Sequence, residues 1–303
     1  MFQISFIQTR DGVRLRTASW EPARGVPLRG ICAIFDGHTE FFEKYGEVMH
    51  ELAARGFAGA ILDWRGQGGS DRSLADPLKA HVVDFSDYDS DLRIFMDEVV
   101  APLTQGRNPT FALAHSMGAH NLLRALRADP KIFTAAIMIA PMLWPQTGGY
   151  PDWLVRSLSS AYGRLGRSEN WVWGMQRDPL RQRFENNRVT SDRARFARTQ
   201  DLLGANHALG LGGPSWGWLR AAYRSMIAMN RPGFAESIST PCLIFGAGRD
   251  RVVSTAAIRD FAGRLSNGTY IEIPEAEHEI LMESNSVRAR FWAAFDSFIS
   301  NYV

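Results

Sequence analysis

Short apolar runs alternate with segments of helical periodicity along most of this 303-residue chain. Continuous runs of this length are typical of strands buried on both faces, and the amphipathic segments between them are typical of covering helices. The runs lie at residues 31–35, 57–63, 110–114, 134–140, 241–246 and 269–273. Helices are predicted at 43–55, 87–100, 117–128, 255–265 and 285–300. A hairpin of strands 2–8 and 13–20 precedes them, and the pattern predicts an α/β fold with a mostly parallel central sheet and helices on both faces.

Residues 142–235 differ in composition from the rest of the chain. They hold thirteen arginines, no lysine and six acidic residues, so this segment carries a charge of +7 within a chain of net charge +2. They also hold six of the nine tryptophans. Because the segment falls between two predicted strands, we expect a helical cap inserted into a core made of residues 1–141 and 236–303.

Composition excludes several classes of protein. With 45% hydrophobic residues the chain can bury a sizeable core, yet no apolar run approaches the ~20 residues that span a bilayer. Residues 1–5 lack the basic and apolar features of a secretory signal, so we expect a cytoplasmic protein. The small net charge argues against a nucleic-acid partner. The two cysteines, Cys32 and Cys242, lie in strand-like runs and are predicted to be reduced core residues, and no metal site is expected.

A serine stands where the run 110–114 passes directly into a predicted helix. The five residues from Ala114 to Gly118 place Ser116 between small residues, two positions before it and two after it. This is the nucleophile-elbow pattern, with alanine in place of the first glycine. A serine in such a turn lies at a helix N-terminus, where the helix dipole favours developing negative charge. The alternative is that Ser116 merely caps the helix.

A serine hydroxyl needs a base, and the base needs an acid to orient it. His278 lies in the loop after the last predicted strand and is the expected general base; the alternative is a solvated loop histidine. Asp250 follows the strand 241–246 and is the expected acid, with a helix cap as its alternative role and with Asp63 and Asp260 as weaker rivals. The order serine, aspartate, histidine is the one found in α/β-hydrolases.

An oxyanion intermediate needs two N–H donors. Met117, directly after the serine, is expected to supply one. The backbone N–H of His38, beside Gly37 in the loop after the first central strand, is expected to supply the other, without a role for the imidazole. The alternative for this loop is an ordinary turn.

These motifs resemble those of the α/β-hydrolase superfamily and, more narrowly, of its lysophospholipase L2 and monoacylglycerol lipase branch. The similar blocks are the serine turn, the pair Asp250/His278, residues 36–40 with Tyr45, and residues 63–70. Asp36 stands where the branch usually has histidine. Three cap features further resemble the lysophospholipase L2 group: Asn187-Val189-Thr190, the segment 212–214, and Trp218. The resemblance implies an α/β-hydrolase fold.

The resemblance also implies a serine carboxylester hydrolase that cleaves a single-chain glycerolipid, a lysophospholipid or a monoacylglycerol, through an acyl-enzyme. A general esterase, or a peptidase or C–C bond hydrolase using the same three residues, is the enzymatic alternative. A catalytically silent lipid-binding protein is the non-enzymatic one. No cofactor is implied, since the glycines of 66–69 do not follow the dinucleotide-binding spacing. Arg65, next to these glycines, is expected to pin neighbouring loops.

The cap is expected to bind the substrate. Apolar aromatic side chains suit an acyl pocket, and the candidates are Trp144, Trp216 and Trp218. Arginine suits phosphate, and the candidates for a lipid head group or an anionic membrane surface are Arg193, Arg195 and Arg198. The alternatives are packing within the cap and a solvated face. A small lipid ester is thus the expected partner, with peripheral contact to the inner face of the membrane, and the oligomeric state stays open.

Overall fold

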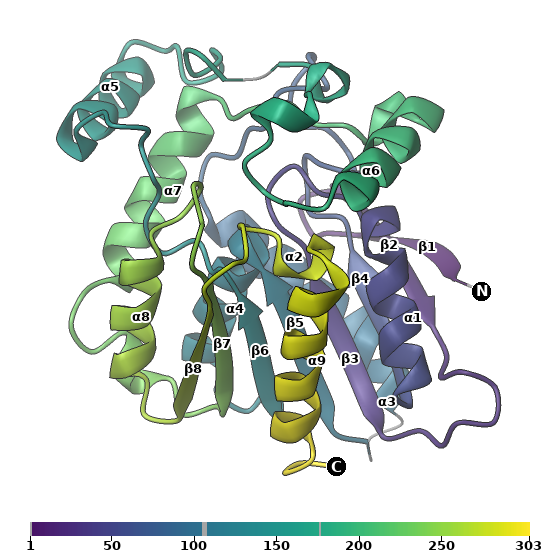
Figure 1. Cartoon of the computed structure of the whole chain (residues 1–303). Coiled ribbons are helices and arrows are strands. Elements are labelled where there is room, and N and C mark those ends of the chain that lie inside the picture. Colours follow the sequence, from purple (N-terminus) through teal and green to yellow (C-terminus); the bar gives the residue numbers. More distant parts are fainter. Residues whose placement is uncertain (1, 105–107, 176) are drawn as a thin grey trace.

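The computed structural model describes residues 2–104, 108–175 and 177–303, which form one eight-stranded sheet (Figure 1). The spatial order is β1-β2-β4-β3-β5-β6-β7-β8. Strand β2 runs antiparallel to both of its neighbours, and all pairs from β4 to β8 are parallel, which confirms the predicted mostly parallel sheet. The strands are β1 (Gln3–Gln8), β2 (Arg14–Trp20), β3 (Gly30–Phe35), β4 (Phe57–Leu62), β5 (Thr110–His115), β6 (Ala135–Ile139), β7 (Cys242–Ala247) and β8 (Gly268–Ile273).

Helices cover both faces of the sheet. Helices α1 and α9 lie on one face, where Arg55 and Asp296 join them by an ion pair of 2.9 Å, and α2 and α4 lie on the other (Figure 1). The core helices and turns are η1 (Phe42–Tyr45), α1 (Gly46–Ala54), α2 (Ser86–Phe95), η2 (Met96–Val100), α3 (Ala101–Thr104), α4 (Ser116–Ala128), α8 (Thr255–Arg264), η7 (Ile280–Met282) and α9 (Asn285–Ile299). The helix predicted at 87–100 differs in one respect, because its last five residues form the π-helical turn η2.

The segment 142–235 crosses the carboxyl ends of the strands, with α5 and α6 farthest from the sheet (Figure 1). Its elements are α5 (Asp152–Arg164), η3 (Pro179–Arg181), η4 (Phe184–Asn186), α6 (Arg193–Ala205), η5 (His207–Leu209), α7 (Trp216–Met229) and η6 (Ala235–Ser237). The buried side chains of α7, among them Trp218, Tyr223 and Met226, belong to the main hydrophobic core. Helix α7 therefore packs against the sheet domain. The division into core and cap at residues 142 and 235 remains a prediction.

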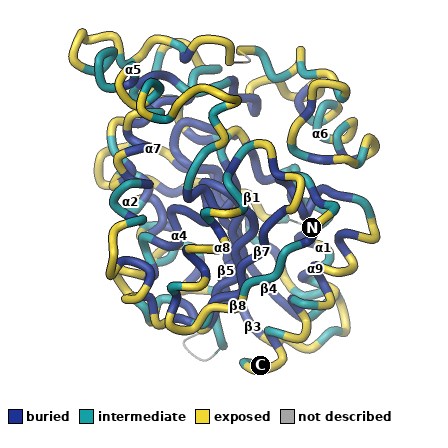
Figure 2. Tube along the Cα trace, turned by 60° about the vertical axis from the view of Figure 1, so that its left-hand side comes forward, coloured by how far each residue is buried: buried dark blue, intermediate teal, exposed yellow. Residues whose placement is uncertain are grey.

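Burial is concentrated in the central strands, which lie inside a shell of partly exposed helices (Figure 2). Cys32 and Cys242 are buried and free, as predicted, and burial raises the pKa of the Cys242 thiol to about 12. Across the described ranges, no helix is both long enough and apolar enough to cross a bilayer.

Arg65 links the loop after β4 to the turn of the amino-terminal hairpin and to helix α2. Its guanidinium donates to both carboxyl oxygens of Asp91 at 2.7–3.0 Å and to Asp11 at 2.8 Å. The Asp91 side chain is fully buried, and this burial raises its pKa to about 6 although Arg65 opposes the rise. The predicted loop-pinning role of Arg65 is thus confirmed.

Replacing Arg65 with methionine should lower the free energy of unfolding by roughly 3 kcal/mol at pH 7, because a buried carboxylate loses its partner. The pKa of Asp91 in the wild type is about 6 because Arg65 opposes the effect of burial, so it should be higher in the variant, and the cost of burying an unpaired carboxylate disappears as the pH falls and Asp91 is protonated. Urea unfolding at pH 7 and pH 5 should therefore give a smaller difference between variant and wild type at pH 5.

The matched control is Arg290→Met, which removes an exposed ion pair with Glu275 and should change stability by less than about 1 kcal/mol. Equal destabilisation by the two variants would contradict the stabilising role of the Arg65–Asp91 pair.

Candidate active site

Ser116 lies at the junction between β5 and α4. Its φ is +49°, a left-handed conformation that a residue other than glycine adopts only when the surrounding structure enforces it. A Cβ at Gly118 would lie 2.3 Å from the Phe35 carbonyl oxygen, so only glycine lets the helix approach the end of β3 this closely. This strand–serine–helix turn matches the predicted elbow. Ser116 is only 7% exposed.

Ser116, His278 and Asp250 form one hydrogen-bonded row. His278 Nε2 lies 2.9 Å from Ser116 Oγ, and His278 Nδ1 lies 2.7 Å from Asp250 Oδ2. An ionised carboxylate can only accept, so Nδ1 carries the proton and Nε2 is free to accept from the Ser116 hydroxyl. The sequence-based prediction that these three residues meet agrees with this geometry, and the row has the arrangement of a serine nucleophile with its base and orienting acid.

The turn after β7 fixes the Asp250 carboxylate. Burial alone would raise its pKa, but the charge and hydrogen bond of His278, together with the backbone N–H groups of Val252 and Val253 at 2.8 Å, hold the pKa of Asp250 below its usual value. The rival aspartates lie elsewhere. Asp63 pairs with Arg16, and Asp260 is exposed on α8.

Two backbone N–H groups near Ser116 are free. In the loop after β3, the N–H of Gly37 donates to Glu40 at 2.5 Å and the N–H of Thr39 donates to Gln67 at 3.3 Å. Between them, the N–H of His38 has no acceptor among the described residues, and neither has that of Met117 at the start of α4. Both predicted oxyanion donors thus have no partner among the described residues, and they are free to bind a ligand oxygen.

Glu40 is the centre of a buried polar network under this loop. Its carboxylate accepts from the Tyr45 hydroxyl at 2.7 Å, from His115 Nδ1 at 2.9 Å and from Lys44 Nζ at 2.6 Å. Lys44 also donates to Glu279 at 2.6 Å, and His115 Nε2 lies 3.3 Å from the His278 carbonyl oxygen. Burial opposes ionisation, yet Lys44 and His115 hold the pKa of Glu40 well below its usual value.

This network was missed by the sequence analysis. Glu40 was noted only as part of a motif, and the network joins three separate segments of the chain: residues 37–45, His115 and residues 278–279. The one available signal was the position of Lys44 four residues after Glu40, the spacing of an ion pair on a helix.

Asp36 carries a buried carboxyl group beside the same loop. Its Oδ1 lies 3.4 Å from the side-chain amide of Gln67, and its Oδ2 has no partner in the part of the chain that the structure describes. Burial, together with the charges of Asp63 and Glu40, raises the pKa of Asp36 well above its usual value. A neutral carboxyl group at this position adds no charge that would oppose an oxyanion.

A cavity of about 290 Å³ opens between the His38 loop and α6. Its apolar wall is formed by Phe41, Met175, Pro179, Val189, Phe196, Leu203, Leu211, Pro214 and Met282. Its charged lining residues are paired: Lys44 with Glu40 and Glu279, and Arg195 with Glu47. The cavity is therefore mainly apolar and offers no unpaired charge among these residues.

The segment 187–191 ties the region above the sheet to the His278 loop. The Glu279 N–H donates to the Val189 carbonyl at 2.7 Å, and the Thr190 hydroxyl donates to the Met282 carbonyl at 2.6 Å. The Asn187 side chain accepts from the Val189 N–H at 2.9 Å, which stiffens the turn. We refer to residues 187–191 as the strap.

The three predicted tryptophans lie in different surroundings. Trp218 is buried, and its ring centroid lies 4.2 Å from that of His38. Trp144 is half-buried and donates to Asp152 at 2.6 Å. Trp216 stacks on Tyr162 at 4.7 Å, within aromatic residues of the 142–235 segment. The structure thus brings only Trp218 to the His38 loop.

The three predicted arginines are engaged in ion pairs. Arg195 is buried and bridges Glu47 and Asp192, at 2.6 and 3.1 Å. Arg198 shares Glu47 at 2.8 Å. Arg193 is exposed and pairs with Glu185 at 3.0 Å. Of the three, only Arg195 lines the apolar cavity, and its guanidinium anchors α6 to the core.

Comparisons with known proteins identify the family of the chain. Residues 26–285 match the family model described as "Serine aminopeptidase, S33". The chain is 30% identical to lysophospholipase L2 of Escherichia coli (strain K12), over 94% of this chain and 86% of that protein. It is 23% identical to a monoacylglycerol lipase of Mycolicibacterium smegmatis, over 90% of this chain and 88% of that protein.

The fold is also that of known hydrolases. A soluble variant of monoglyceride lipase from Saccharomyces cerevisiae superposes with a TM-score of 0.80 at 17% identity, covering 99% of this chain and 95% of that one. A thermostable carboxyl esterase from Bacillus coagulans superposes with a TM-score of 0.78 at 16% identity, covering 99% and 98%. The predicted α/β-hydrolase fold is therefore confirmed. The chain belongs to the serine aminopeptidase S33 family of α/β-hydrolases, in the branch of lysophospholipase L2 and monoacylglycerol lipase.

Proposed function

We propose that this protein hydrolyses the ester bond of a single-chain glycerolipid, a lysophospholipid or a monoacylglycerol, with Ser116 as nucleophile. The observation that carries the proposal is the hydrogen-bonded row from Ser116 through His278 to Asp250. The family membership and the relatives that are lipid esterases support it.

The first half-reaction forms an acyl-enzyme. Ser116 Oγ attacks the acyl carbonyl carbon while its proton moves to His278 Nε2, and Asp250 stabilises the imidazolium that results. The negative charge on the carbonyl oxygen is held by the N–H groups of His38 and Met117. When the tetrahedral intermediate collapses, His278 returns the proton to the leaving alcohol, the glycerol portion of the lipid.

The second half-reaction releases the fatty acid. A water molecule gives its proton to His278 Nε2 and attacks the acyl carbon, and the same two N–H groups hold the second oxyanion. Collapse breaks the bond to Ser116 Oγ, which takes back the proton. Every residue in this cycle belongs to the chain itself.

The apolar cavity beside His38 is the proposed site of the acyl chain. Each buried methylene contributes about 0.8 kcal/mol, so a long single chain binds there better than an acetyl group does. Because the charged residues in its wall are paired, the cavity suits hydrocarbon better than a phosphate group.

The peptidase alternative is less well supported. An aminopeptidase binds a terminal ammonium group, for which a free carboxylate near the serine is the natural partner. Glu279, the carboxylate that lines the apolar cavity, is already paired with Lys44 and is not free for this role. Peripheral contact with an anionic membrane is a further proposal, supported by the +7 charge of residues 142–235. The cytoplasmic location remains a prediction.

Replacing Ser116 or His278 with alanine should each lower kcat by roughly 10⁴–10⁶, and the double variant should lose little more, because the residues act as one unit. Asp250→Asn should lower kcat by about 10⁴, since the amide favours the wrong histidine tautomer. Steady-state turnover of p-nitrophenyl butyrate measures all four variants.

Asp260→Asn, on the exposed face of α8, is the control and should retain wild-type kcat. Multiplicative losses in the double variant, or a 10⁴ loss in the control, would show that the assignment is wrong.

Replacing His38 with phenylalanine should leave kcat/KM within about tenfold of wild type, because the proposed oxyanion donor is its backbone N–H. Burial lowers the pKa of the His38 imidazole to about 4, so the ring is already uncharged at pH 7. The same substitution at His278 is the matched comparison and should abolish turnover. A loss of 10³ or more in His38→Phe would mean that the imidazole takes part.

Replacing Thr199 with tryptophan should fill part of the apolar cavity, because Thr199 lines it from α6. We expect kcat/KM for p-nitrophenyl palmitate to fall at least tenfold while that for p-nitrophenyl acetate changes less than twofold. Asp201→Trp, on the exposed side of the same helix, is the control. An equal change for both esters would place the acyl chain elsewhere.

A further inference from the structure

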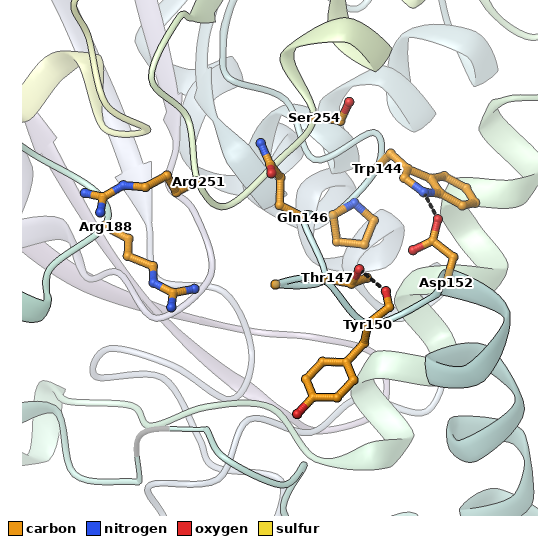
Figure 3. A pocket seen from close by; sticks show the side chains of 11 residues that line it. Trp144, Gln146, Thr147, Tyr150, Asp152, Arg188, Arg251 and Ser254 are labelled. Atoms are coloured by element: carbon orange, nitrogen blue, oxygen red, sulfur yellow. Dashed lines mark hydrogen bonds between the residues drawn. The ribbon is translucent and has the colours of Figure 1, made fainter.

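A second, open recess of about 740 Å³ lies on the other side of the strap from the apolar cavity. It is lined by Trp144, Pro145, Gln146, Thr147, Gly148, Gly149, Tyr150, Asp152, Arg188, Arg251 and Ser254 (Figure 3). Arg188 and Arg251 face Gln146 and Thr147 across the recess (Figure 3). Its lining is mainly polar, in contrast with the cavity beside α6.

The charge of Arg188 is available to a ligand. Within residues 2–104, 108–175 and 177–303, the Arg188 guanidinium forms no hydrogen bond or ion pair, unlike the three arginines of α6. Its backbone is held in place, because the neighbouring residues Asn187 and Val189 are bonded to each other and to the His278 loop. Arg251, in the turn after Asp250, donates to the Asn187 carbonyl at 3.1 Å and pairs with Glu277 at 3.1 Å, so it positions the strap and brings no unpaired charge.

Hydrogen bonds to backbone carbonyls connect the wall of the recess to the turns that hold Asp250 and Ser116. The Gln146 side-chain amide donates to the Asp250 carbonyl at 2.8 Å, and the Ser254 N–H donates to the Trp144 carbonyl at 2.8 Å. Two residues before Trp144, the Met142 N–H donates to the Ser116 carbonyl at 3.0 Å. The wall of the recess is therefore bonded to the backbone of Asp250, and the chain leading into this wall is bonded to the backbone of Ser116.

The far side of the recess has a different chemistry. Asp152 provides a carboxylate, whose Oδ2 accepts from Trp144 at 2.6 Å, so the Trp144 ring lies next to it, while the Tyr150 ring points away from it (Figure 3). Aromatic faces beside a carboxylate suit an ammonium group. The recess thus offers a cationic side and an anionic, aromatic side.

We propose that this recess binds the head group of a lysophospholipid, with its phosphate at Arg188 and its ammonium group near Asp152. Guanidinium groups suit phosphate oxygens, and Arg188 supplies a positive charge that no carboxylate among the described residues neutralises, whereas the charge of Arg251 is paired with Glu277. The inference rests on the proposed ester hydrolysis at Ser116 and names the substrate within it. The strap then separates the head group, on the Arg188 side, from the acyl chain, on the Val189 side.

The test compares two esters with the same acyl chain, lysophosphatidylcholine and monopalmitoylglycerol. Arg188→Gln should raise the KM for lysophosphatidylcholine about tenfold relative to the KM for monopalmitoylglycerol, because only the phosphate ester loses a charged contact. Arg183→Gln removes an exposed arginine of the segment 142–235 that lies outside the recess, and it should leave the ratio of the two KM values within twofold of wild type. An unchanged ratio in Arg188→Gln, or an equal rise in Arg183→Gln, would overturn the assignment.

Inhibition distinguishes a lipid head group from free phosphate. Glycerophosphocholine should compete with monopalmitoylglycerol, and its inhibition constant should rise about tenfold in Arg188→Gln. Inorganic phosphate that inhibits as strongly as glycerophosphocholine would overturn the head-group assignment. Turnover of monopalmitoylglycerol without any turnover of lysophosphatidylcholine would overturn the recess proposal alone. Loss of both activities in the wild type, together with no labelling of Ser116 by a fluorophosphonate, would overturn the proposed function.

Discussion

The carboxylate of Glu40 holds together the loops on which the site depends. One oxygen accepts from the Gly37 N–H, the Tyr45 hydroxyl and His115, and the other accepts from Lys44. A buried ion pair stabilises a fold only when its remaining hydrogen-bonding capacity is also satisfied, and here it is. The Glu40 carboxylate connects the oxyanion loop to the serine turn through His115, which is next to Ser116. It connects the same loop to the histidine loop through Lys44, which pairs with Glu279 next to His278.

The strap gives this arrangement its second level of organisation. It is bonded to the His278 loop at Glu279 and Met282, so the wall of the substrate site and the candidate base are parts of one rigid unit. Val189 faces the apolar cavity and Arg188 faces the polar recess. A single-chain lipid has a hydrocarbon chain and a polar head group. Two adjacent residues of the strap therefore face the two sites proposed for these two parts.

The sequence was most informative where chemistry follows directly from local pattern. Apolar runs predicted the strands, and polar residues just after them, Ser116, Asp250 and His278, meet as expected because parallel strands end at one edge of the sheet. The backbone N–H of His38 also agrees with the prediction, because the N–H groups of Gly37 and Thr39 on either side of it are hydrogen-bonded and that of His38 has no acceptor among the described residues. Local pattern was sufficient here because each residue stands at a strand or helix end.

Prediction was weakest where long-range pairing decides what a side chain does. The arginines of α6 look alike in sequence, but Arg195 and Arg198 bind Glu47 from α1, which no local pattern reveals. Arg188 carries no motif at all, and what distinguishes it is that the fold places it in the recess without a partner among the described residues.

The most direct measurement is acid-quenched mass spectrometry of the enzyme during turnover of monopalmitoylglycerol. We expect a palmitoyl group esterified to the peptide that contains Ser116, accumulating before fatty acid release reaches its steady state. An enzyme that turns over this ester with an acyl group on another residue would contradict it.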